Sequence, residues 1–110
     1  LNATIILLNN NGGGIFSFLP QAAEAEHFET LFGTPHGLDF RPLAELYGAE
    51  FARVADWQEF REAVRRGIAA GGLHIVEVPT ERDRNVALHE ELWSAVAGAL
   101  ARELMQEAAV

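Results

Sequence analysis

Three asparagines followed by three glycines form the stretch whose side chains best suit the binding of a ligand. Residues 9–11 offer amide oxygens, and residues 12–14 lack a Cβ, so the backbone there can turn sharply and approach a ligand closely. Hard cations prefer oxygen ligands, and Mg²⁺ is usually held by a few protein oxygens together with substrate phosphates. An amide oxygen and a nearby backbone carbonyl suit that chemistry. The alternative interpretation is a glycine-rich turn that binds nothing.

An apolar run precedes this loop and another follows it. Residues 3–8 predict a short buried strand, because the run is brief, partly β-branched and ended by turn residues. Ligands of open α/β sheets bind outside the carboxyl ends of the strands, which is where the loop would lie. The residues after the loop are large and apolar and are closed by a proline: Ile15, Phe16, Phe18, Leu19 and Pro20.

Two further strands are predicted, each followed by a helix. Residues 51–54 and 73–78 have strand composition, and the second run is apolar enough to be covered on both faces. Asp56 and Glu59 resemble a capping box at the start of a helix. That helix would place four apolar residues on one face: Trp57, Phe60, Val64 and Ile68.

Helical segments fill most of the remaining sequence. Residues 22–32 have helical composition, and Asp39 suits the N-cap of a short helix that Gly48 would end. A long C-terminal helix carries an apolar stripe of the kind that usually packs in a core: Leu88, Leu92, Val96, Leu100 and Leu104. Three strands, each followed by helical sequence, predict an α/β fold, a three-layer parallel sheet with helices on both faces.

Composition narrows the class of partner. A chain of 110 residues forms one domain at most. The net charge of −8 argues against a nucleic-acid or anionic-membrane partner, because both need a basic face. The absence of cysteine excludes disulfide and thiol chemistry. We find no apolar run long enough for a membrane span and no signal peptide, so we expect a cytoplasmic protein.

The order of strand, oxygen-rich glycine loop, apolar wall and proline resembles the distal half of the thiamine-diphosphate motif, whose Asn-Asn end carries a metal ligand. Residues 9–20, with 31–40 and 85–89, are similar to one branch of these enzymes. That branch is the menaquinone-pathway synthases that make 2-succinyl-5-enolpyruvyl-6-hydroxy-3-cyclohexene-1-carboxylate. The resemblance implies thiamine diphosphate and Mg²⁺ (or Mn²⁺) as cofactors. It also implies decarboxylation of 2-oxoglutarate and addition of the succinyl semialdehyde carbanion to isochorismate.

The resemblance assigns roles to individual loop residues. Asn10 would bind the metal through its side-chain oxygen, and Gly12 would bind it through its backbone carbonyl. Asn11 and Gly13 would lie against the cofactor with these two ligands. Asn9 and Asn11 could instead hold the loop through local hydrogen bonds.

The resemblance also gives the apolar residues after the loop a catalytic role. Ile15, Phe16 and Leu19 would form a wall beside the reactive thiazolium, with Ile15 touching the cofactor. Low polarity there favours the loss of charge during decarboxylation. Plain core packing is the alternative for these three side chains.

Several parts of such a site are missing from the sequence. The upstream aspartate ligand, the glutamate that activates the aminopyrimidine and the substrate-binding arginines have no counterpart here. We therefore expect residues 1–110 to be the C-terminal part of a thiamine-diphosphate-binding (pyrophosphate) domain. Such a fragment would be inactive alone, and the intact parent would be a homodimer or a dimer of dimers.

Other functions remain open at this point. A different thiamine-diphosphate-dependent decarboxylase or synthase would share the Asn-Gly loop, and a non-catalytic interaction domain would use the sheet and last helix only for docking. A nucleotide-binding domain would need glycine motifs that do not occur. We expect His36 to be a structural loop residue and His89 to lie on a helix surface.

Overall fold

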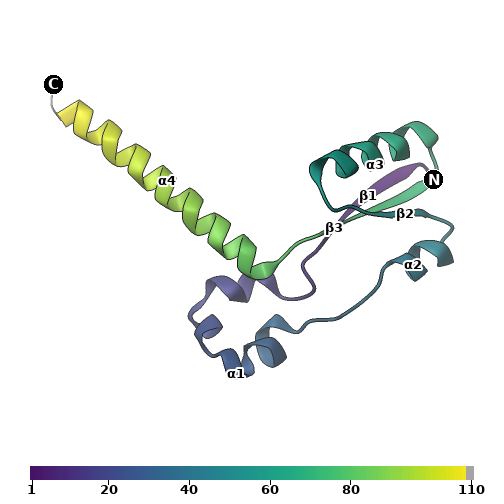
Figure 1. The fold of residues 1–110 in the computed structure, drawn as a ribbon, viewed down its shortest axis with the longest axis horizontal. Coiled ribbons are helices and arrows are strands. Elements are labelled where there is room, and N and C mark those ends of the chain that lie inside the picture. The colour runs from purple at the N-terminus through teal and green to yellow at the C-terminus, as the bar shows by residue number, and fades with distance from the viewer. Residues whose placement is uncertain (109–110) are drawn as a thin grey trace.

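A parallel three-stranded sheet forms the centre of the protein. The computed structural model describes residues 1–108. Strands β1 (Ala3–Asn9), β2 (Glu50–Arg53) and β3 (Leu73–Pro79) pair in the order β1-β3-β2, with β3 in the middle (Figure 1). The register runs from Ala3 opposite Leu73 to Asn9 opposite Pro79, so β1 and β3 end at the same level. The predicted α/β fold with a parallel sheet is confirmed.

The central strand is buried and the first strand is not. β3 has four consecutive buried residues, as expected for a strand paired on both sides. The prediction that β1 is buried is wrong: within residues 1–108, β1 is an edge strand that pairs with β3 alone, and its faces are largely uncovered. Its Ile5 and Ile6 are exposed, and Leu8 is 69% exposed.

Helix α3 (Trp57–Ala70) packs across β1 and β3. The expected capping box is confirmed: Asp56 Oδ1 accepts from the amides of Gln58 and Glu59, and Glu59 Oε2 accepts from the amide of Ala55. Val54, Ala63 and Val76 form the core beneath the helix.

The expected apolar face of α3 meets the sheet in part: Phe60 packs against the core, and Val64 is half-buried. Trp57 and Ile68 are exposed, whereas Ala63 and Gly67 are buried. A Cβ added to Gly67 would come 2.8 Å from Thr4 Oγ1. The small residues therefore allow a close approach of helix and sheet, which a search for large apolar residues misses.

The segment after the Asn-Gly loop is a chain of short turns rather than the single helix expected over residues 22–32. It contains η1 (Gly14–Phe18), η2 (Pro20–Ala23), α1 (Ala25–Phe28) and η3 (Glu29–Gly33). Glu24 has ψ of 64°, outside the helical region, and separates η2 from α1. Thr34 has a left-handed φ of 41°, and its amide closes the wide last turn by donating a hydrogen bond to the Glu29 carbonyl.

Helix α2 (Arg41–Leu46) contacts β2 and ends, as expected, near Gly48, whose φ is +64°. Its N-cap is Phe40 and not Asp39. The Asp39 carboxylate instead accepts from the Arg41 amide and forms an ion pair with Arg53.

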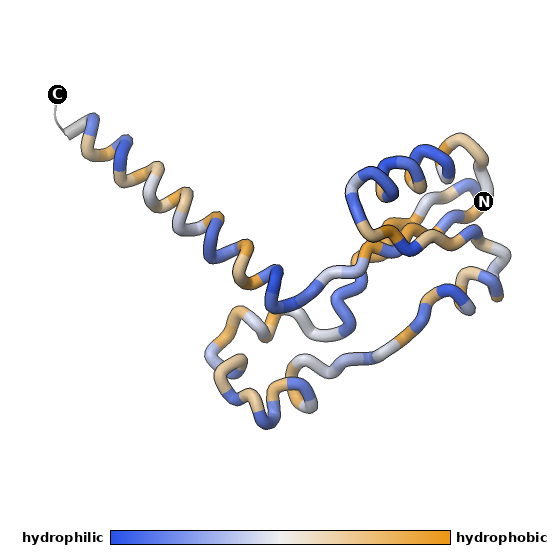
Figure 2. The backbone as a smooth tube through the Cα atoms, viewed as in Figure 1, coloured by the Kyte–Doolittle hydropathy of each residue, from blue (hydrophilic) through white to orange (hydrophobic). Residues whose placement is uncertain are grey.

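Helix α4 (Arg82–Ala108) leaves the body of the molecule as a long arm (Figure 1). The radius of gyration is 19.7 Å, against about 13 Å for a compact domain of this size. The apolar stripe that we expected in a core is exposed, and Val96 at its middle is 57% exposed. Apolar residues alternate with polar ones along the arm (Figure 2). Among the described residues, no helix has the length and apolarity needed to span a membrane.

Candidate functional site

The Asn-Gly loop lies between β1 and η1, at the carboxyl ends of β1 and β3, as the sequence predicts. A pocket of about 250 Å³ opens beside it. Residues from the loop, from the end of β1 and from the start of α4 line this pocket: Leu8, Asn10, Gly14, Thr80, Glu81, Arg82 and Asn85. The position agrees with the general rule for ligand sites in parallel sheets.

Asn9 holds the loop to the sheet. Its Nδ2 donates to Glu77 Oε1 at 2.7 Å, and its Oδ1 accepts from the Asn11 amide at 3.0 Å. Its carbonyl accepts from the amide of Thr80 at 2.9 Å. Both ends of the side-chain amide are thereby used, so Asn9 has the local structural role that the sequence left open.

Asn10 presents its side chain to the pocket. Its Oδ1 accepts a single hydrogen bond of 3.2 Å from the Gly12 amide, and a carbonyl oxygen has two lone pairs. A Cβ on Gly14 would come 2.6 Å from Asn10 Nδ2, so a larger residue at position 14 would displace this amide. The oxygen of Asn10 is oriented and can still accept a ligand.

Close backbone packing joins the loop to the segment around residue 33. The amide of Gly13 donates to the Gly33 carbonyl at 2.8 Å. Gly12 has φ of +148°, and a Cβ there would overlap the Gly33 carbonyl oxygen. Asn11, in the left-handed region at φ 54°, accepts from the amide of Gly37 at 2.8 Å. These contacts give the loop one shape.

The three expected wall residues do not share one environment. Ile15 is 70% exposed and Leu19 is also exposed. Phe16 is half-buried and packs against Phe32, with ring centroids 5.5 Å apart, and Phe32 in turn stacks on Phe28. In this chain Phe16 therefore belongs to an aromatic cluster, whereas Ile15 and Leu19 are free to meet another surface.

A buried carboxylate that the sequence analysis did not single out lies behind the loop. Glu77 is 1% exposed and accepts from Arg53 Nε at 2.7 Å as well as from Asn9. The hydrogen bond and charge of Glu77 raise the pKa of Arg53 above its usual range, and Asp39 acts in the same direction. The sequence signal was an acidic residue inside an otherwise apolar strand.

Arg82 is the second functional candidate that sequence reasoning missed. It is the first residue of α4 and lines the pocket with Asn10. Its Nη2 donates to Glu29 Oε2 at 2.6 Å. Its Nη1 is buried against Gly33 and has no hydrogen-bond partner within the described residues.

His36 and His89 are both held by local contacts. The amide of Leu38 donates to His36 Nδ1 at 3.0 Å, and the His36 ring contacts Phe40 edge-on. His89 is partly buried, not on an open surface, because its ring packs between Phe18 and Trp93. Arg65 and Arg66, near the end of α3, are exposed.

The donor set fits one part of a metal site. The free lone pair of Asn10 and the backbone carbonyl of Gly12 are neutral oxygens of the type that Mg²⁺ and Mn²⁺ accept. Within residues 1–108, no group of three or more histidine or acidic side chains is arranged to hold a metal ion. Negative charge for a divalent cation would therefore come from phosphate oxygens and from a carboxylate supplied elsewhere.

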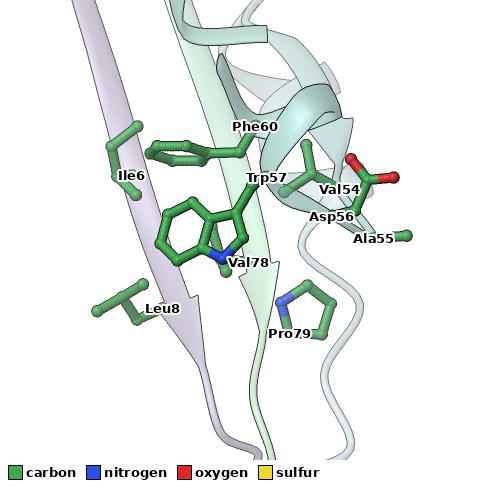
Figure 3. Close-up of a pocket in the computed structure, with 9 residues that line it drawn as sticks. All are labelled: Ile6, Leu8, Val54, Ala55, Asp56, Trp57, Phe60, Val78 and Pro79. Carbon is green, nitrogen blue, oxygen red and sulfur yellow. The ribbon is translucent and has the colours of Figure 1, made fainter. Parts of the chain in front are cut away.

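A second pocket, of about 440 Å³, lies on the α3 face of the sheet (Figure 3). Ile6 and Leu8 of β1 form one wall, and Trp57 and Phe60 of α3 form another. The lining is almost entirely apolar, with Asp56 engaged in capping α3. It offers packing surface but no groups for chemistry.

The comparison with protein families decides the identity of the domain. The family described as thiamine pyrophosphate enzyme, C-terminal TPP binding domain, matches residues 1–78. These residues include the Asn-Gly loop and the whole sheet except Pro79. The chain belongs to this family. The resemblance to thiamine-diphosphate enzymes seen in the sequence is confirmed.

Curated relatives narrow the resemblance to the branch expected from the sequence. A 2-succinyl-5-enolpyruvyl-6-hydroxy-3-cyclohexene-1-carboxylate synthase of Bacillus cytotoxicus is 56% identical over 94 residues, 86% of this chain and 16% of the relative. The synthase of the same name from Chloroflexus aurantiacus is 54% identical over 102 residues, 93% of this chain and 17% of the relative. That from Geobacillus kaustophilus is 53% identical over 102 residues. The chain spans less than a fifth of the length of these relatives.

Proposed function

We propose that this chain forms the metal- and diphosphate-binding end of a thiamine-diphosphate-dependent synthase. The proposed reaction decarboxylates 2-oxoglutarate and joins the resulting succinyl semialdehyde unit to isochorismate, as in menaquinone biosynthesis. The observation that carries the proposal is Asn10, oriented by Gly12 and Gly14 at the end of β1 with a lone pair still free. The identity to synthases of that name supports the choice of reaction.

The chain's own residues would bind and orient the cofactor. Asn10 Oδ1 and the Gly12 carbonyl would be ligands to Mg²⁺ or Mn²⁺, while Asn11 and Gly13 would hold the loop closed around the diphosphate. Thiamine diphosphate, when bound, supplies the stabilisation of the carbanion. Ile15 and Leu19, which are exposed here, would cover the reactive part of the cofactor and exclude water.

We also propose that activity needs protein segments other than these. The described residues lack the acidic cluster that would complete the metal site, and the match covers under a fifth of each relative. Residues 1–110 would then be the C-terminal part of the pyrophosphate-binding domain, of which the last two residues lie outside the described part. A cytoplasmic homodimer or dimer of dimers, with cofactor sites between subunits, is the proposed assembly.

Substitution of Asn10 in the complete synthase that carries this segment tests the proposal. Asn10→Ala should weaken thiamine diphosphate binding about tenfold at low Mg²⁺, because a metal ligand is lost. Calorimetry across a Mg²⁺ titration measures this. Asn2→Ala is the matched control, since Asn2 also accepts a backbone hydrogen bond, from Gly72, but at the opposite end of the sheet.

Two outcomes would contradict the proposal. Unchanged cofactor affinity of Asn10→Ala at every Mg²⁺ concentration would remove Asn10 from the metal site. Turnover of a different 2-oxoacid, with none of isochorismate, would leave the cofactor assignment and favour another decarboxylase or synthase of the family.

A further inference from the structure

The buried carboxylate of Glu77 joins two loops that are far apart in the sequence. The side chain lies on the central strand, and its two oxygens accept from different donors, Asn9 Nδ2 and Arg53 Nε, each at 2.7 Å. A buried carboxylate is costly unless it is paired and hydrogen-bonded. Both requirements are met here.

The first connection leads from Glu77 to the Asn-Gly loop. Asn9 donates to Glu77 with its amide nitrogen and accepts from the Asn11 amide with its amide oxygen. Because Glu77 can only accept, it fixes which end of the Asn9 amide points toward the loop. The Asn9 oxygen therefore points toward the Asn11 amide. The hydrogen bond between them fixes the backbone on both sides of Asn10.

The second connection leads to residues 36–41. Arg53 donates to Glu77 with Nε and to Asp39 with Nη2, at 3.4 Å. Asp39 accepts from the Arg41 amide at 3.1 Å, and two residues earlier the amide of Gly37 donates to Asn11. The two connections therefore meet again at the contact between Asn11 and Gly37.

We propose that Glu77 is a positioning residue that fixes the Asn-Gly loop and the residue 36–41 loop relative to one another. It acts through Asn9 and Arg53, which its two oxygens contact directly. The idea that Glu77 thereby holds a metal ligand in place rests on the proposed function. The hydrogen bonds that connect the two loops are observed independently of it. The two donors bond different oxygens of the carboxylate, whereas glutamine has one acceptor atom and an NH₂ group that only donates. Glutamine at this position would therefore break one of the two connections.

Glu77→Gln in the 110-residue chain tests this, with Val76→Ala as the matched control. Val76 is the preceding residue of β3, is 2% exposed and packs in the core with Val54 and Ala63. The measurement is hydrogen exchange by NMR at the amides of Asn11 and Gly37, each compared with exchange at β3 amides. Glu77→Gln should accelerate exchange at Asn11 or Gly37 about tenfold beyond any change in β3, as for loss of one charge-assisted hydrogen bond. Val76→Ala should accelerate hydrogen exchange by the same factor at the loop amides and at the β3 amides.

Arg53→Met keeps the test decisive if Glu77→Gln does not fold. This substitution removes the second connection, and the Arg53 side chain is half exposed, so the fold should tolerate the change. Hydrogen exchange should be accelerated more at the Gly37 amide than at the Asn11 amide. Equal acceleration at loop and strand amides in both variants would show that Glu77 is merely structural and overturn the proposal. Titration of the complete synthase with Mn²⁺ and thiamine diphosphate reports separately on metal binding. Absence of binding there would count against the proposed function and not against the positioning role.

Discussion

The Asn-Gly loop and helix α4 differ in how far their side chains are held by the rest of the protein. In the loop, Asn9 and Asn11 are each engaged in hydrogen bonds, and the Gly12 backbone packs against Gly33. Along α4 beyond Trp93, large apolar residues are exposed one turn after another. The loop has less regular structure than the helix, yet its shape is fixed more tightly.

The difference shows that regular secondary structure and tertiary order are separate properties. α4 is regular because each backbone amide bonds within the helix, which requires no neighbour. The loop is ordered because side chains and other segments bond its backbone groups. A substitution in the loop should therefore disturb several segments, whereas one in the outer part of α4 should disturb none.

The largest effect is expected at Gly12. Gly12→Ala should lower the free energy of unfolding by about 3 kcal/mol, because φ of +148° is strained for alanine and the new Cβ overlaps the Gly33 carbonyl. Gly48→Ala is the control: its φ is also positive, at +64°, but nothing lies within 4 Å of the added Cβ. It should cost about 1 kcal/mol. Urea unfolding followed by circular dichroism measures both, and equal losses would mean that the contact with Gly33 is unimportant.

The same substitution at two valines, one in the core and one on α4, should give an effect on stability of intermediate size. Val76→Ala in β3 should cost about 2 kcal/mol, since it removes methyl groups from the core. Val96→Ala, the same change on the exposed stripe of α4, should alter the free energy of unfolding by less than about 0.5 kcal/mol. A large loss at Val96 in dilute solution would show that another surface covers the arm.

The smallest effect on stability, but a visible one on mass, is expected from the stripe itself. Exposed apolar surface of this extent favours association, so the 110-residue chain should gain apparent mass with concentration in light scattering. Leu92→Gln combined with Leu100→Gln should weaken that association about tenfold or more. Ser94→Gln, at an exposed position outside the stripe, should leave it unchanged. A chain that is monomeric at every concentration would contradict this prediction.

Local sequence signals predicted most of the fold. The three strands appear within one residue of their predicted ends, and the Asp56 cap and Gly48 turn come from short-range chemistry that a single sequence shows. The position of the loop at a strand end followed from the same signals. Asn10 and Gly12 could be singled out because their neighbours carry a family resemblance.

What the sequence did not reveal depends on contacts between distant residues. Glu77 meets Asn9 across 68 positions, and Arg82 meets Glu29 across 53. The exposure of β1 and of the α4 stripe likewise depends on what is packed against them, which an apolar pattern does not specify. Burial was therefore predicted for both, and it was wrong for both.

The pairing of β1 with β3 has a consequence for the order of folding. Ala3 lies opposite Leu73, so β1 has to wait for its β3 partner while about 70 further residues are made. At 5–20 residues per second, this delay lasts roughly 4 to 14 s. The unit β2-α3-β3, which closes over about 30 residues, can form as soon as it emerges, because short loops close at lower entropic cost. β1 would then add to a preformed edge of β3, bringing the Asn-Gly loop into place as the last step.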